Sequence, residues 1–146
     1  MKFSPGDIIE IEGANGLHYV QVTHDHTSYP EVVRALGGTH DSRPADIHEL
    51  ARSETAFTAM TALGSAIENE RISGSRIGNA AIPEQDLAFP IFRMPIRNKQ
   101  GDIAYWWLWN GQGLRYETGL TPEAEKYPMR EVMSAEAFLR RLAESL

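Results

Sequence analysis

Alternating apolar and polar residues open the chain and predict an antiparallel β-meander. Residues 7–12 alternate with isoleucines on one face, and residues 17–23 return as a second strand rich in β-branched and aromatic side chains. Asn15 and Gly16 between them are residue types of a tight hairpin turn. A third strand is predicted at 31–36, because two glycines follow it.

The middle of the chain alternates short helical and extended patterns. Pro44 suits the first turn of a helix, and the apolar spacing after it indicates a helix over 44–52. Prolines at both ends of 89–96 favour an edge strand there. Between these segments we expect a strand at 55–62, a helical turn at 63–69 and a strand at 76–82.

A second hairpin has the strongest local signal. Residues 103–109 and 114–118 flank Asn110-Gly111-Gln112-Gly113, a typical turn sequence. The two-residue period of strands fixes which side chains share a face, whatever the loop length. One face is predicted to carry Tyr105, Trp107, Leu114 and Tyr116, and the other Trp106, Leu108, Arg115 and Glu117.

The C-terminus is predicted to be an amphipathic helix capped by Ser134, after a short helix at Thr121-Pro122-Glu123. Its apolar stripe comprises Ala135, Phe138, Leu139, Leu142 and Leu146. No repeat, linker or charge block marks a boundary. We therefore predict a single α+β domain, 1–146, mostly antiparallel β, a small SH3-like barrel or sandwich with short helices and a C-terminal helix.

Composition excludes several classes of chemistry. The 146 residues contain no cysteine, which rules out disulfides, thiolate metal sites and cysteine nucleophiles. The first residues lack the apolar segment of a secretory signal, and no apolar run reaches the roughly 20 residues of a membrane helix. A formal charge of −6 opposes general attraction to nucleic acid or anionic lipid. We expect a cytoplasmic protein that binds neither.

Catalytic motifs are missing from the sequence. It has no glycine-rich phosphate loop and no nucleophile elbow, and His48-Glu49 starts a zinc-protease pattern that Arg52 breaks. We expect no enzyme activity and no cofactor.

Histidines provide only a weak metal candidate. His24 and His26 are two residues apart and would share a face of a strand, with His18 at the same parity. His18 lies about 20 Å from His24 along an extended strand at roughly 3.3 Å per residue, however. We interpret His24 and His26 as exposed loop residues, with no metal bound.

The aromatic strand 105–109 has two structural explanations, one for each face. Tyr105, Trp107 and Tyr116 are expected to fill a core, or alternatively to line a ligand pocket. Trp106 on the other face is expected to be covered by the C-terminal helix or presented to a partner.

The segments Phe3-Ser4-Pro5-Gly6-Asp7-Ile8-Ile9-Glu10-Ile11, Tyr19-Val20-Gln21-Val22 and Trp106-Trp107-Leu108-Trp109-Asn110-Gly111 resemble SH3-like barrels and, more particularly, the bacterial immunity protein 26 family. The resemblance implies a bacterial protein that neutralises a toxin by binding it. An acidic surface would fit a basic toxin.

Two functions of different class follow. The leading hypothesis is a non-enzymatic domain that binds a protein, with Glu10, Glu12, Trp106, Arg115 and Glu117 as contacts. The alternative is a small-ligand-binding or enzymatic domain whose pocket is lined by Tyr105, Trp107 and Tyr116. A third interpretation is a plain housekeeping domain whose partner is unknown.

Overall fold

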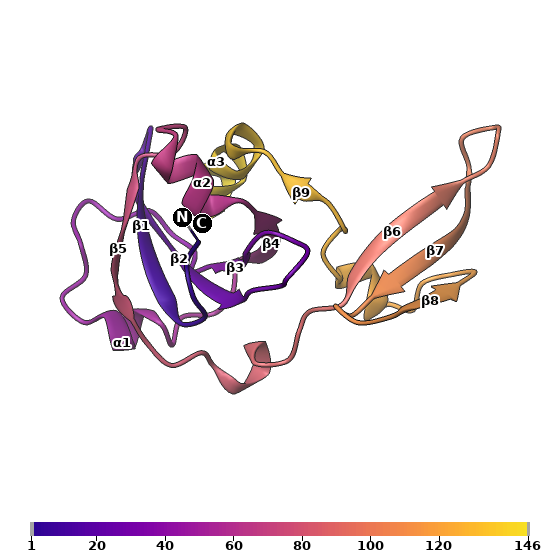
Figure 1. Ribbon diagram of the computed structural model, residues 1–146, viewed down its shortest axis with the longest axis horizontal. Helices are drawn as coiled ribbons and strands as arrows, with labels where there is room; N and C mark the ends of the chain where they lie inside the picture. The colour runs from indigo at the N-terminus through magenta and orange to yellow at the C-terminus, as the bar shows by residue number, and fades with distance from the viewer. Residues whose placement is uncertain (1, 146) are drawn as a thin grey trace. The chain divides into compact units, whose positions relative to one another are not determined.

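Six strands form one sheet in the order β5-β1-β2-β3-β4-β9 in the computed structural model, which describes residues 2–145 (Figure 1). All neighbours are antiparallel except β4 and β9. The order is open, with β5 and β9 at the edges, and no pairing among residues 2–145 closes it into a barrel. The strands are β1 (Asp7–Gly13), β2 (Gly16–His24), β3 (Val32–Ala35), β4 (Phe57–Thr61), β5 (Gly74–Asn79) and β9 (Val132–Met133).

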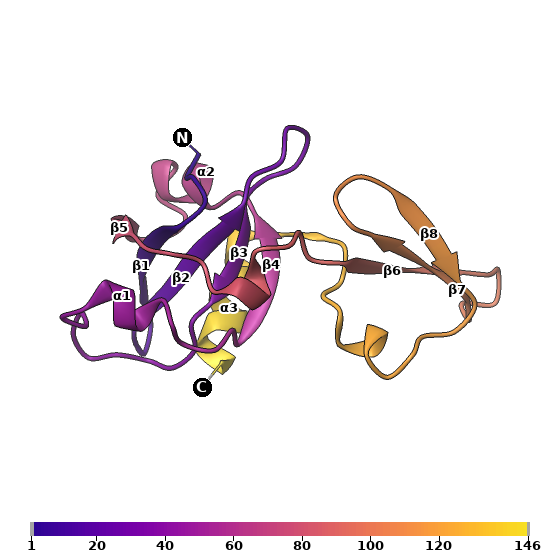
Figure 2. The same cartoon turned by 90° about the horizontal axis from the view of Figure 1, so that it is seen from below.

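Three more strands form a separate antiparallel sheet in the order β6-β7-β8 (Figures 1 and 2). They are β6 (Phe92–Arg97), β7 (Ile103–Trp109) and β8 (Leu114–Glu117). The helices are α1 (Ile47–Leu50), α2 (Leu63–Glu68) and α3 (Ala135–Glu144), with 3₁₀ turns η1 (Glu84–Asp86) and η2 (Ala124–Lys126). The predicted α+β class, mostly antiparallel with short helices and a C-terminal helix, is confirmed.

The chain's contacts divide into two compact units. The six-stranded unit comprises Met1–Leu87 and Val132–Leu146, and the three-stranded unit is Ala88–Glu131. The predicted single domain stays a prediction, because the density of contacts does not measure whether two units unfold together.

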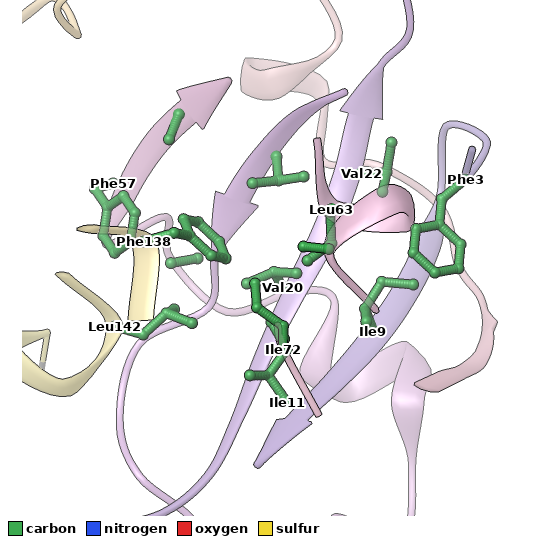
Figure 3. Close-up of a cluster of buried hydrophobic side chains, with 14 residues drawn as sticks. Phe3, Ile9, Ile11, Val20, Val22, Phe57, Leu63, Ile72, Phe138 and Leu142 are labelled. Atoms are coloured by element: carbon green, nitrogen blue, oxygen red, sulfur yellow. The ribbon is translucent and has the colours of Figure 1, made fainter. Parts of the chain in front are cut away.

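Both faces of the six-stranded sheet are covered. On one face, α2 and α3 pack over the larger core, in which Phe138 meets Phe57 edge to face with ring centroids 6.0 Å apart (Figure 3). The smaller core on the opposite face includes Leu50 and Ala51 from the α1 region. The prediction that Ile9 and Ile11 share one face of β1 is therefore confirmed. Ile8, on the opposite face, is buried as well.

The C-terminal helix begins where the sequence predicted. Ser134 accepts a hydrogen bond from the Ala137 N–H through its side chain, and Phe138 and Leu142 are buried in the larger core. The expectation that this helix covers Trp106 is wrong, since its buried residues belong to the core of the six-stranded unit. Leu146, placed on the stripe from the sequence, lies outside the described residues.

Some other elements are shorter than the sequence predicted, and a capping residue explains the case of α1. The helix predicted at 44–52 is the shorter α1, because the Asp46 side chain accepts from the N–H groups of His48 and Glu49 and so begins the helix after Pro44. The helix predicted around Pro122 is only the 3₁₀ turn η2. Strand β9 has two residues, too few for any periodic pattern.

A buried arginine on β3 links the sheet to the segment that follows α1. Arg34, on β3, is fully buried, and its guanidinium donates to the carbonyls of Ala51 and Ser53 and to the side chain of Gln21. Burial lowers the pKa of Arg34, against an opposing effect of Asp86. Carbonyl and amide oxygens, together with the Thr55 hydroxyl, thus satisfy this cation.

Candidate functional site

The three-stranded sheet collects apolar side chains on one face. Trp107 lies opposite Met94 on β6 and opposite Tyr116 on β8, so alternate residues of all three strands share this side. We call it the aromatic face. Its members are Phe92, Met94, Ile96, Tyr105, Trp107, Trp109, Leu114 and Tyr116.

One end of the aromatic face is closed. Phe92 and Trp109 are buried, and Phe89 lies edge-on to Trp109 at 5.3 Å between ring centroids. The Arg130 guanidinium stacks over the Trp109 ring at 5.1 Å. This end is the small core of the unit.

The other end of the aromatic face is open to solvent. Tyr105, Trp107 and Tyr116 form an edge-to-face triad, with centroids 5.5 Å apart for the tyrosine pair and 6.0 and 6.2 Å from Trp107. Tyr116 is 58% exposed. Leu114 lies opposite Trp109 on the outer strand β8, at the other end of the face, and is 54% exposed. The expectation that these rings fill a core is wrong at this end: Tyr105 and Trp107 are half-buried and Tyr116 is exposed.

The opposite face of the sheet is partly closed by its own side chains. The Arg93 guanidinium stacks over Trp106 at 5.1 Å and is held by the Tyr127 carbonyl at 2.8 Å. Leu108 is buried, whereas Arg115 and Glu117 on β8 are exposed and 3.7 Å apart. Trp106 is half-buried under Arg93, and so offers less free ring surface than Tyr116.

A small pocket lies beside the end of the β7–β8 hairpin. Its volume is about 220 Å³, and its lining comprises Ile91, Leu108, Asn110, Gly113, Leu114 and Arg115. None of Tyr105, Trp107 and Tyr116 lines it. The structure brings those three rings together on an open face.

Glu10 and Glu12 lie on β1, outside the three-stranded unit. Arg43 donates two hydrogen bonds to the Glu10 carboxylate, at 2.8 and 3.0 Å, and the Tyr19 hydroxyl donates a third at 2.8 Å. The Arg43 hydrogen bond is the main cause that lowers the pKa of Glu10. The side chain of Glu10 is only 12% exposed, so little of it is available to a partner. Glu12 is exposed.

The candidate histidines are bound to neighbouring groups. His24, expected in an exposed loop, is instead the half-buried last residue of β2. Its ring nitrogens contact the Thr23 hydroxyl and the Leu87 carbonyl at 2.9 and 2.8 Å. His18 is buried, with Nε2 3.1 Å from the Asn15 side-chain oxygen, and His26 packs edge-on against Tyr29. Among residues 2–145, no three potential ligands gather at one point.

Met94 and Ile96 also belong to the aromatic face, although the sequence pattern alone did not single them out. Both are half-buried on β6, on the same side as Trp107 and Tyr105. The alternation of Phe92, Met94 and Ile96 was the available signal, although Pro95 between them obscured it.

Charge is divided unequally between the units. The six-stranded unit contains 15 acidic and 8 basic side chains, counting Asp, Glu, Lys and Arg, whereas the three-stranded unit contains 5 and 6. The acidity of the chain therefore belongs to the six-stranded unit.

Comparison with protein-family models, with curated proteins and with solved structures yields no match for this chain. Within residues 2–145, no helix has the length and apolar character needed to cross a membrane.

Proposed function

We propose that this chain is a non-enzymatic protein-binding domain whose contact surface is the open end of the aromatic face. The observation that carries the proposal is the edge-to-face triad of Tyr105, Trp107 and the exposed Tyr116. The exposed Leu114 lies beside Tyr116 on the same face of β8. Tyrosine and tryptophan are enriched at the energetic centres of protein interfaces, because large rings bury much area at little entropic cost.

An open face suits a protein better than a small molecule. Ligand pockets usually enclose about 300–1,000 Å³ and bury most of the ligand. None of the three rings lines the 220 Å³ pocket, and Tyr116 is 58% exposed. The nearly balanced charge of the three-stranded unit also gives little attraction for a phosphate backbone.

The proposed partner is a basic protein, and the proposed role is that of an immunity protein that neutralises a toxin. The excess of acidic side chains lies on the six-stranded unit, outside the proposed contact surface, and supports this through long-range steering of a basic partner. The meander of β1, β2 and β3 is the element that an SH3-like fold would share, and it supports the proposed kinship with immunity protein 26.

The test is copurification of tagged protein from its native host, with partners identified by mass spectrometry. We expect a stoichiometric basic partner that is toxic when produced alone and harmless when produced together with this chain. Trp107→Ala should weaken its binding at least about 30-fold, a loss of about 2 kcal/mol, as at interface hot spots.

Two variants serve as controls. Trp106→Ala makes the same chemical change on the opposite face of the same strand, and Leu87→Ala removes a side chain as exposed as Tyr116, at 58%, from the six-stranded unit. Both should bind the partner normally. If Trp106→Ala loses the partner while Trp107→Ala still binds it, the contact surface is instead the face that carries Arg115 and Glu117.

A further inference from the structure

Strand β8 leaves one edge of the three-stranded sheet unpaired. It is the outer strand of the order β6-β7-β8, and no strand within residues 2–145 pairs with its outer side (Figure 2). All four of its residues are exposed. Such an edge presents free backbone donors and acceptors to another strand.

The hairpin register shows which backbone groups point outward. The Asn110 N–H donates to the Gly113 carbonyl at 3.4 Å, which makes these two residues a hydrogen-bonded pair. Hydrogen-bonded and non-hydrogen-bonded pairs alternate along an antiparallel ladder. Trp109–Leu114 and Trp107–Tyr116 are therefore non-hydrogen-bonded pairs. The N–H and C=O groups of Leu114 and Tyr116 point away from β7, toward the free edge.

The side chains of β8 complement a second β8 in one register. When two copies meet antiparallel about a two-fold axis, with Tyr116 opposite Tyr116, each Arg115 lies opposite Glu117 of the other copy. Tyr116 then forms the hydrogen-bonded pair, which its outward backbone groups allow. Each Arg115–Glu117 pair is non-hydrogen-bonded, the kind in which side chains come closest.

Neighbouring two-fold registers place like charges together. Centring the pair on Arg115 sets two guanidinium groups opposite each other, and centring it on Glu117 does the same for two carboxylates. Charges on an edge strand normally discourage pairing. Here their order, Leu114-Arg115-Tyr116-Glu117, opposes those registers and favours the one centred on Tyr116.

We infer that a second copy of this chain binds along β8, joining two three-stranded sheets into one six-stranded sheet. Because paired residues share a face, the two aromatic faces become continuous across the joint, with Tyr116 beside Tyr116. This goes beyond the proposed function and does not rest on it, since the contact is made by the strand edge.

The test is charge exchange, measured by sedimentation equilibrium. The wild-type mass should rise from 16.3 kDa for one chain to twice that value between micromolar and millimolar concentration. R115E sets glutamates opposite each other, and E117R sets arginines opposite each other. Each variant alone should dimerise at least about tenfold more weakly, because like charges replace opposite ones at both pairs.

Mixing the two single variants decides the register. In the mixed dimer every charge again faces its opposite, so R115E with E117R should form a heterodimer of wild-type affinity, as should the double variant R115E/E117R with itself. Restored association also shows that both single variants fold. The inference is overturned if the wild type stays at one chain mass at millimolar concentration, if either single variant dimerises as the wild type does, or if the mixture does not associate.

Discussion

The two sheets of this chain bury their side chains differently. In the six-stranded unit, helices and loops cover both faces, and Ile8, Ile9 and Ile11 are all fully buried. In the three-stranded unit, one end of the aromatic face is closed by Phe89 and Arg130 while Leu114 and Tyr116 stay exposed. The first unit has the packing that stabilises a fold, and the second has exposed apolar area of the kind used for binding.

Alternation alone does not distinguish a core from a contact surface. Strands β2 and β7 both combine aromatic and apolar residues. Tyr19 on β2 is buried beside Glu10, whereas Tyr105 on β7 is half-buried in an open triad. The coverage supplied by other segments makes the difference.

The largest expected effect is on the closed unit. Phe138 is fully buried in the larger core, where it meets Phe57. Phe138→Ala removes that packing and leaves a cavity, which typically costs about 3–5 kcal/mol of unfolding free energy. Urea denaturation followed by far-UV circular dichroism measures the loss. A loss below about 1 kcal/mol would contradict the burial described for α3.

The same variant separates the two units. All three tryptophans, Trp106, Trp107 and Trp109, lie in the three-stranded unit, so their fluorescence reports on that unit. We expect the fluorescence midpoint to shift less than the circular dichroism midpoint, because the lost contacts belong to the six-stranded core. Equal shifts by both probes would instead confirm the predicted single cooperative domain.

Local signals predicted much of this fold. A strong turn sequence and two-residue parity predicted which side chains of β7 and β8 share a face, and Ser134 marks the start of α3. These features depend on neighbours in sequence. The pairing of β9 with β4, residues 132–133 with 60–61, joins distant segments and has no local pattern.

The candidate site was harder to predict than the fold. The stripe of α3 would fit any apolar sheet face, and the sequence cannot choose between two such faces, so coverage of Trp106 was wrongly expected. Buried Arg34 was not anticipated either, because its carbonyl partners at Ala51 and Ser53 come from a loop whose path depends on tertiary structure. The rings of the triad were all identified, but their exposure was not.

A smaller effect on stability than that of Phe138→Ala is expected at Asp7 of the six-stranded unit, where it depends on pH. Burial raises the pKa of Asp7, but hydrogen bonds from the Ser4 N–H, Arg76 and Asn79 outweigh it and leave the pKa below its ordinary value of 3.8. A carboxylate with a lowered folded-state pKa stabilises the protein above its unfolded pKa, and this stabilisation is lost as pH falls through the folded value.

Asp7→Asn should therefore reduce stability at pH 7 and reduce it less as the solution is acidified below about pH 4. Urea denaturation of both proteins across this range, followed by circular dichroism, measures the narrowing gap. Asp25→Asn, which changes an exposed carboxylate in the loop after β2, is the matched control. A gap between Asp7→Asn and wild type that stays constant with pH would contradict the proposed linkage.

The smallest stability effect is expected at the surface proposed to bind a partner. Trp107 is half-buried and contacts Tyr105 and the exposed Tyr116 edge to face. Trp107→Ala should cost less than about 2 kcal/mol, since an open face leaves no enclosed cavity. Trp106 and Trp109 still report unfolding of this unit by fluorescence. A loss as large as that of Phe138→Ala would mean that Trp107 belongs to a closed core, and the weakened partner binding expected of this variant would then reflect unfolding.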